Sequence, residues 1–408
     1  MKTFEDLYND LLKRKISLNE PLPLDYDPAH LDCLLHPEKY APVLQVKDCE
    51  ACAYDRACVN SCVFDAIRED KDGKLMIDPK ACVGCEACIR ACENKNLTAS
   101  KDVLPAMKAV REAKGSVYMM IAPAFLGQLG ENVTPGKLRS AFKALGFTGM
   151  VEVALFADIL TLKEALEFDR NVSEEGDFQL TSCCCPVWIA MLRKVYSELM
   201  PHVPGAVSPM VACGRMIKKL DPDAVTVFAG PCLAKKNEAR EPDIADAVDY
   251  VLTFQEVKDI FEAADIHPEE LMEQGKEHAS KAGRLYARTK GVSQAVSEMV
   301  EQLRPDRSIR VRAAQANGTK ECMEMIRKLK NGEIEANFYE GMGCVGGCVG
   351  GPKAILPKEE GMENVDEYAE KSAFKTPLEN PYVLKVLEKL GLETVEELLD
   401  DTLLTREF

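Results

Sequence analysis

Two runs of four cysteines place the strongest limit on what the first part of this chain can fold into. The first run has the spacing C-x2-C-x5-C-x3-C over residues 49–62, and the second has C-x2-C-x2-C-x3-C over residues 82–92. Residues 41–100 otherwise contain few long apolar periods from which a large core could form. We therefore expect residues 41–100 to be a small domain that bound metal holds together.

The second run has the spacing of a bacterial-type ferredoxin, in which three close cysteines bind one [4Fe-4S] cluster and the fourth binds the other cluster. This resemblance implies a small α+β ferredoxin-like domain with two ligand sets that cross between the runs. One set is Cys62, Cys82, Cys85 and Cys88, and the other is Cys49, Cys52, Cys58 and Cys92. The first run is longer than usual between its second and third cysteines, which a loop tolerates at little cost. A pair of zinc sites is the alternative.

Composition limits the compartment and the partners. The chain has 17 cysteines but only five histidines, and no histidine has the spacing to a second ligand that a zinc or non-haem iron site requires. No apolar run approaches the length of a membrane span, and charges are spread through residues 1–7. These features lead us to expect a cytoplasmic protein, and spaced cysteines in that compartment more often bind metal than form disulfides. The net charge of −16 argues against nucleic-acid binding and is compatible with a soluble protein partner that has a basic patch.

Strand-like and helix-like segments alternate from about residue 101 to residue 352. The expected strands are 116–122, 150–155, 178–182, 224–229, 250–254, 309–314 and 336–339. The expected helices are 136–144, 160–169, 187–199, 255–264, 293–303 and 319–330. Such alternation predicts parallel sheets flanked by helices. A helical lead at 1–40 and a charged tail at 353–408, with helices near 364–371 and 380–401, complete the chain.

Three further cysteine segments lie near the ends of expected strands, where sites form in parallel sheets. They are Thr181-Ser182-Cys183-Cys184-Cys185-Pro186, Gly230-Pro231-Cys232-Leu233-Ala234-Lys235 and Glu340-Gly341-Met342-Gly343-Cys344-Val345-Gly346-Gly347-Cys348. Three adjacent cysteines cannot share one core pocket, because neighbouring side chains on a strand face opposite ways. One thiolate from each of the first two segments and two from the third could hold a further [4Fe-4S] cube. Cys184 would then be left for acid–base work.

In this order, the three segments resemble the signature segments of the [FeFe]-hydrogenases, and the resemblance covers about residues 45–400. It implies a catalytic domain at 101–352 made of two α/β lobes, each with a parallel sheet, that closes on the H-cluster. That cofactor is a [4Fe-4S] cube joined through a cysteine to a diiron unit with CO, CN⁻ and an azadithiolate bridge. The implied cube ligands are Cys185, Cys232, Cys344 and Cys348, of which Cys348 would also bridge to the diiron unit.

The implied reaction is 2H⁺ + 2e⁻ ⇌ H₂. The N-terminal clusters would carry electrons to and from a soluble carrier such as ferredoxin, and maturation enzymes would supply the diiron unit. By the same resemblance, Lys235 would hydrogen-bond a cyanide, Cys184 would pass protons to the bridging amine and Met342 would pack over the diiron unit. Ser208 and Cys183 are the other expected cofactor-binding residues.

The chain departs from the common family pattern at several positions. Cys183 stands where a serine usually precedes the cysteine pair, Gly230 stands where a methionine is usual, and Pro204 replaces a serine of the proton path. These departures indicate a divergent branch, so an H₂ sensor with low turnover is one alternative. A hydrogenase-like iron–sulfur assembly protein, which keeps the cube cysteines without the diiron unit, is another. Cys184 and Lys235 favour the hydrogenase over the assembly protein.

The family's proton path continues through two glutamates three residues apart on a helix. Glu164 and Glu167 take these places when the helix is matched by its distance to the cysteines. Ala165 and Phe168 take them when it is matched on its first three residues. Either pair lies on one helix face. We expect Glu164 and Glu167 to act in proton transfer, and ordinary charge on a helix surface is the alternative.

Overall fold

The computed structural model describes residues 1–17, 25–49, 52, 56–71, 74–182, 184–275 and 278–408. A four-stranded parallel sheet forms the first of two lobes, in the order β6-β5-β8-β9. Its strands are β5 (Val117–Ile121), β6 (Gly149–Glu152), β8 (Val225–Gly230) and β9 (Tyr250–Thr253). Met119 in the middle of β5 is fully buried and pairs with Met150 on one side and Val227 on the other. Such apolar strands suit a sheet that is covered on both faces.

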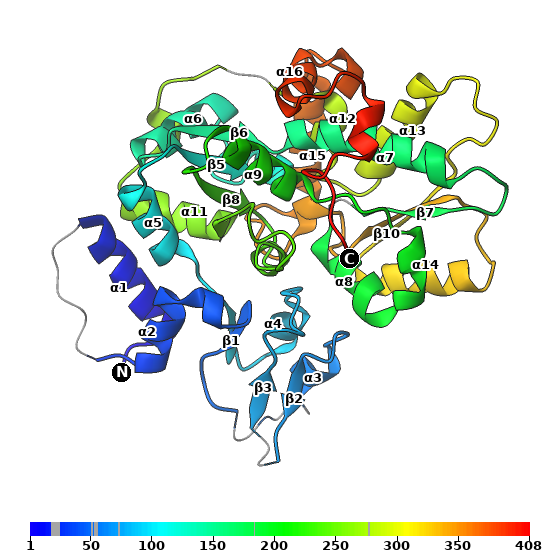
Figure 1. Ribbon diagram of the computed structural model, residues 1–408. Coiled ribbons are helices and arrows are strands. Elements are labelled where there is room, and N and C mark those ends of the chain that lie inside the picture. Colours follow the sequence, from blue (N-terminus) through cyan, green and yellow to red (C-terminus); the bar gives the residue numbers. More distant parts are fainter. Residues whose placement is uncertain (18–24, 50–51, 53–55, 72–73, 183, 276–277) are drawn as a thin grey trace.

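A three-stranded parallel sheet with the order β10-β11-β7 forms the second lobe. Its strands are β7 (Gln179–Leu180), β10 (Ala313–Asn317) and β11 (Phe338–Met342). Figure 1 shows the two sheets beside one another, with the described residues before position 100 below them in that view. The predicted arrangement of two parallel-sheet lobes is confirmed.

Helices cover both sheets. The first lobe packs against α5 (Val103–Glu112), α6 (Pro135–Ala144), α9 (Pro209–Leu220) and α11 (Phe254–Ala263). The second packs against α8 (Pro186–Val195), α13 (Gly291–Leu303) and α14 (Thr319–Lys330). The helix α7 (Ala154–Asn171) contacts α9 of the first lobe and α13 of the second, and its residues from Ala154 to Phe168 are all buried. It therefore joins the two lobes through one core.

The N-terminal part contains two antiparallel strand pairs. β1 (Val43–Gln45) pairs with β4 (Leu97–Ala99), and β2 (Ile67–Glu69) pairs with β3 (Leu75–Ile77). Two short helices, α3 (Ala57–Asn60) and α4 (Ala87–Ala91), complete this unit, and α1 (Phe4–Ser17), α2 (Pro28–Leu35) and the 3-10 helix η1 (Pro37–Lys39) precede it. Its core includes Cys58, Cys82 and Cys88 together with Leu233 of the first lobe. The cysteine-rich unit is thus packed directly onto the first lobe.

The C-terminal helices pack on the lobes. They are α15 (Lys358–Glu370) and α16 (Pro381–Leu390). The short helices in the rest of the fold are α10 (Ala234–Glu238), α12 (Lys281–Leu285), η2 (Pro123–Phe125), η3 (Ser197–His202), η4 (Pro268–Glu270), η5 (Cys348–Gly350), η6 (Pro377–Glu379) and η7 (Glu396–Leu399). Arg284 donates to the carbonyl of Tyr368 at 2.7 Å, which ties α12 to α15. No helix in the described part of the chain is long and apolar enough to span a membrane.

Several expected elements differ in extent from those observed. The strand expected at 309–314 begins only at Ala313, because the Arg312 N–H donates to the side-chain oxygen of Asn337 at 2.7 Å instead of to a neighbouring strand. The single helix expected at 380–401 ends at Leu390. There Gly391 has a φ of 85° and the next N–H bonds back to Leu387, a C-terminal cap of the Schellman type.

The helix expected at 160–169 is longer than predicted. It begins at Ala154 and includes the last two residues of the strand expected at 150–155. Because residues 154–168 are buried all round, the helix has no polar face whose periodicity could mark its first turn.

Candidate functional site

The two cysteine runs fold around two separate cavities in the N-terminal unit. Cys62, Cys82, Cys85 and Cys88 line one of them. Cys49, Cys52, Cys58 and Cys92 line the other. These are the crossed sets expected from the spacing.

Backbone N–H groups point at sulfurs in both cavities. Ala66 donates to Cys62 Sγ at 3.3 Å, and Asn96 donates to Cys92 Sγ at 3.3 Å. No three His, Cys, Asp or Glu side chains among the described residues lie close enough together to hold a single metal ion. Four thiols spread around a cavity, with N–H groups aimed at the sulfurs, are the donor set of a [4Fe-4S] cube, so the residues fit the expected cluster.

The third cysteine group comes from four loop positions between the lobes. Cys185 precedes α8, with Pro186 at the first helical position, and Cys232 follows the end of β8. Cys344 follows β11, and Cys348 begins the 3-10 helix η5. The Gly343 N–H donates to Cys185 Sγ at 3.2 Å, which joins the first segment to the third. The ends of three strands therefore bring these thiols together.

Electrostatics also shows that these four thiols lie close to one another. Burial raises the pKa of each, and the neighbouring sulfurs add to this. The pKa of Cys232 is raised to about 12 by burial and then by the charge of Cys185. Four thiolates this close repel each other unless a cationic iron–sulfur core lies among them. The donor set thus fits a third cube.

Gly341 in the third segment allows close packing against the ring of Trp188. A Cβ on Gly341 would lie 2.2 Å from the ring of Trp188 on α8. The Trp188 indole in turn donates to the carbonyl of Thr181 at 3.0 Å. Trp188 therefore contacts both Thr181 and the end of β11, which holds the start of α8, just after Cys185, against the third segment.

Lys235 lies beside the cysteine group on the short helix α10. Its ammonium is buried and forms an ion pair with Glu238 at 2.6 Å, which uses one of its three N–H donors. Burial alone would lower the pKa of Lys235, whereas the charges of Glu238, Cys232 and Cys348 raise it overall. The side chain is therefore a buried cation with hydrogen-bonding capacity to spare, next to two of the four thiols.

The neighbouring Lys236 anchors the same helix. Its fully buried Nζ bonds to Asp102 at 3.1 Å, Glu256 at 2.8 Å and the carbonyl of Ser100 at 2.9 Å. Asp102 and Ser100 directly follow the cysteine-rich unit, and Glu256 belongs to α11 of the first lobe. This network holds α10 in place, so that Lys235 is presented to the cysteine group.

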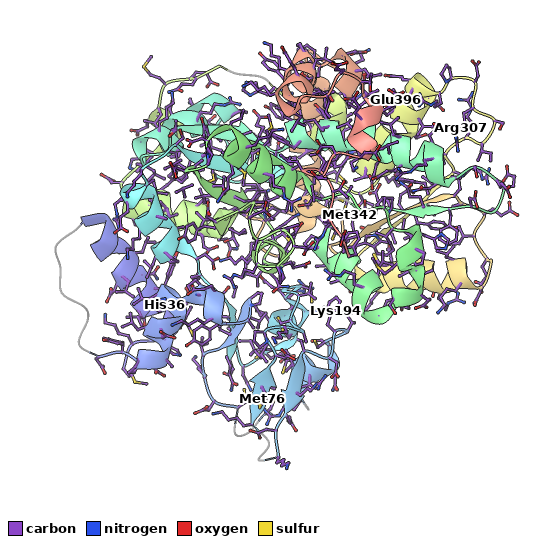
Figure 2. The ribbon with its side chains drawn as sticks, in the orientation of Figure 1. His36, Met76, Lys194, Arg307, Met342 and Glu396 are labelled. Carbon is purple, nitrogen blue, oxygen red and sulfur yellow. The ribbon has the colours of Figure 1, made fainter. Side chains whose placement is uncertain are left out.

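Four further residues were expected at the site, namely Cys183, Cys184, Met342 and Ser208. Cys184 is half-buried and packs against the main core, while Cys183 lies outside the described residues. Met342 is buried at the end of β11, and Figure 2 places it near the centre of the molecule. Ser208 caps α9 by accepting a bond from the Val211 N–H, so its predicted contact with a cofactor stays a prediction.

Both glutamates of the expected proton path are buried on α7, so the surface-charge explanation for them is wrong. Glu164 accepts bonds from the Ser182 N–H at 3.0 Å and the Ser182 hydroxyl at 3.4 Å. Burial raises the pKa of Glu167 to about 7, against the opposing charge of Lys163. Ala165 and Phe168 are apolar core residues on the same helix.

The partners of the two glutamates, Ser182 and Lys163, were not predicted from the sequence. Ser182 links Glu164 to the cysteine segment, and its position two residues before Cys184 was the only available signal. Lys163 pairs with Glu167 at 3.5 Å and donates to the carbonyl of Leu398 at 2.7 Å. The helical pattern of apolar and polar positions does not indicate that a lysine of this kind is buried.

Lys194 marks the junction between the cysteine-rich unit and the second lobe (Figure 2). Its ammonium on α8 donates to the carbonyls of Lys80 at 2.9 Å and Ala81 at 3.1 Å, just before Cys82. A Cβ on Gly84 would lie 3.1 Å from Cα of Ala234. The loop around the Cys82 set therefore contacts the loop that carries Cys232.

Comparison with known proteins decides the family. The family described as iron only hydrogenase large subunit, C-terminal domain, matches residues 115–352, which contain all three segments of the cysteine group. The chain belongs to the iron-only hydrogenase family. The predicted resemblance is thereby confirmed.

The similar proteins include named hydrogenases and a named iron-sulfur assembly component. The periplasmic [Fe] hydrogenase large subunit of Nitratidesulfovibrio vulgaris is 26% identical over 370 residues, with 71% of this chain and 88% of the relative covered. Iron hydrogenase 1 of Clostridium pasteurianum is 28% identical over 308 residues, with 63% of this chain but only 53% of the relative covered. Cytosolic iron-sulfur assembly component 3 of Rattus norvegicus is 25% identical over 359 residues, with coverage of 72% and 75%.

Solved structures share the fold. A variant of the [FeFe]-hydrogenase HydA1 from Chlamydomonas reinhardtii superposes with a TM-score of 0.59 at 22% identity, covering 73% of this chain and 97% of that chain. The α/β fold with parallel sheets flanked by helices is therefore that of the [FeFe]-hydrogenase domain.

Proposed function

We propose that this iron-only hydrogenase family member catalyses 2H⁺ + 2e⁻ ⇌ H₂ at an H-cluster held by Cys185, Cys232, Cys344 and Cys348. When bound, that cofactor supplies the iron chemistry that makes and splits the H–H bond. The observation that carries the proposal is the buried Lys235 ammonium beside the thiols, which pairs with Glu238 and has further N–H donors to spare. A cube held by four cysteines needs no such cation, whereas an anionic cyanide next to the cube would be bound by it.

The proton-handling residues continue from the cysteine group into α7. Cys184 would hold a proton at Sγ beside the cofactor, and Ser182 Oγ lies within 3.4 Å of the Glu164 carboxylate. Glu167 lies three residues further along the helix, with a pKa of about 7. A carboxyl group with this pKa can take up and release protons near neutral pH. We assign Glu164 and Glu167 to a route that uses Ser182 in place of the serine that Pro204 replaces.

We assign residues 41–100 to electron transfer through two [4Fe-4S] clusters, residues 101–352 to the catalytic domain, residues 1–40 to a helical lead and residues 353–408 to a packed C-terminal tail. The contact between Gly84 and Ala234 supports electron exchange between the Cys82 set and the cube. A soluble carrier such as ferredoxin would deliver or accept electrons at the other set. A cytoplasmic location and dedicated maturation enzymes complete the proposal.

A second candidate is an iron–sulfur assembly protein without the diiron unit. It is favoured by relatives with that name, which match at 25% identity against 26% for a named hydrogenase, so that identity does not separate the two. A low-turnover H₂ sensor would share the site and differ in rate, and Pro204 in the proton path favours such a change.

Infrared spectroscopy of protein produced together with the maturation enzymes tests the proposal. We expect bands of metal-bound CO and CN⁻, together with H₂ evolution from a reduced carrier. Protein that contains the cube by iron analysis but has no such bands would contradict the hydrogenase proposal and favour the assembly protein. Bands with only slight turnover would favour the sensor.

A further inference from the structure

The two cysteine sets of the N-terminal unit have different polar surroundings. Cys49 Sγ receives the Asn96 side-chain amide at 3.2 Å and the Gln45 side-chain amide at 3.6 Å. Asn96 is buried and also donates from its backbone N–H to Cys92 Sγ at 3.3 Å. It therefore touches two ligands of one set, and its side-chain amide is held in place by a second bond to the carbonyl of Asp48 at 3.3 Å.

The other set lacks these amides at the corresponding positions. Ala66 stands four residues after Cys62, as Asn96 stands four residues after Cys92, and its N–H bonds to Cys62 Sγ at the same distance of 3.3 Å. Its methyl side chain has no donor. Asp78 stands four residues before Cys82, as Gln45 stands four residues before Cys49, and its carboxylate accepts from the backbone N–H groups of Lys80 and Ala81.

Reduction adds negative charge to an iron–sulfur cluster and its thiolate ligands. An N–H group aimed at a ligand sulfur stabilises the reduced form more than the oxidised form, so it raises the reduction potential. We propose that Asn96 and Gln45 raise the potential of the cluster held by the Cys49 set above that of the cluster held by the Cys82 set.

The positions of the two sets give this difference a direction. The Cys82 set lies next to the catalytic lobes, because Cys82 and Cys88 share a core with Leu233, which follows Cys232. Among the described residues, those that line the cavity of the Cys49 set all lie between 49 and 97. The potential therefore rises away from the cube, and electrons released at the H-cluster flow outward downhill, which favours H₂ oxidation. This direction rests on the proposed function, whereas the potential difference does not.

Electron paramagnetic resonance at controlled potentials tests the difference in the full chain, produced without the diiron maturation enzymes. We expect Asn96→Leu to change the reduced-to-oxidised ratio of one cluster about tenfold at fixed potential, which lowers its midpoint by about 59 mV for a one-electron couple. Ala66→Asn, the matched reciprocal variant, should raise a second, lower-lying midpoint. Gln45→Leu should lower the same midpoint as Asn96→Leu by a smaller amount.

Iron analysis shows whether each variant keeps its clusters. If Asn96→Leu loses iron, Gln45→Leu decides the question, because its contact lies in the more exposed part of the site. Unchanged midpoints, or a shift of the lower midpoint by Asn96→Leu, would overturn the proposal. Absence of CO and CN⁻ bands in matured protein would overturn the hydrogenase function but would leave these midpoints and their meaning intact.

Discussion

Replacement of Glu167 by glutamine should make the protein more stable at alkaline pH and less active. The pKa of this carboxyl is about 7 in the folded chain, against an ordinary value of 4.5, chiefly because burial disfavours its charged form. The folded state therefore binds a proton that the unfolded state has already lost between pH 4.5 and 7, so stability falls as pH rises through this window. Each pKa unit corresponds to about 1.4 kcal/mol, so ionisation of Glu167 costs the folded protein about 3 kcal/mol.

Glutamine cannot ionise and has nearly the shape of the protonated acid. Glu167→Gln should therefore remove this part of the pH dependence and stabilise the chain at pH 8 by up to about 3 kcal/mol. Urea unfolding followed by circular dichroism at pH 5, 6, 7 and 8 measures the effect, and Glu301→Gln on the exposed face of α13 is the matched control. If Glu167 handles protons, the same variant loses H₂ turnover in matured protein. Unfolding midpoints with the same pH dependence as the parent chain would refute the reasoning.

Three further predictions concern other parts of the site. Cys184→Ala should keep the CO and CN⁻ bands of matured protein and lose most H₂ turnover, because the half-buried thiol is the proposed proton carrier. Full activity would show that protons travel by another route, and Cys183 would then be the first residue to test. Lys236→Met should destabilise the chain by about 3–5 kcal/mol in urea unfolding, because buried Glu256 loses its ion-pair partner and Asp102 keeps only Arg240. Lys108→Met in the exposed pair with Glu112 should change stability by less than about 1 kcal/mol. Cys62→Ala and Cys92→Ala should each remove one cluster, with a different spectral signal lost in each, and loss of the same signal in both would contradict the crossed sets.

The cysteine positions could be predicted from the sequence because their spacing is local. A thiol two or three residues from the next can reach the same cluster whatever the rest of the chain does, and the crossed sets around the two cavities follow from that. The group of Cys185, Cys232 and Cys344 was predictable for a different reason. Cys185 and Cys344 follow β7 and β11 of one parallel sheet, whose strands bring their carboxyl ends to one edge. Cys232 follows β8 of the other sheet, and it was expected in the group because its segment resembles a family signature.

The proton route was harder to predict because α7 is buried on every side. Helical periodicity distinguishes a buried face from an exposed face, and it cannot indicate burial where both faces are covered, as in α7. The same sequence was therefore compatible with a surface location for Glu164 and Glu167. The strand expected at 309–314 failed because the side chain of Asn337, distant in sequence, takes the backbone N–H of Arg312.

The contact between α7 and the 3-10 helix η7 affects how the protein is made. Lys163 donates to the carbonyl of Leu398, a residue 235 positions later in the chain. During synthesis α7 therefore leaves the ribosome long before the partner that satisfies its buried ammonium. The strands of the cysteine-rich unit pair within residues 43–99, so this unit is translated well before that partner. The α7 core closes only after residues 396–399 are translated, and the clusters proposed for the N-terminal unit can be loaded before then.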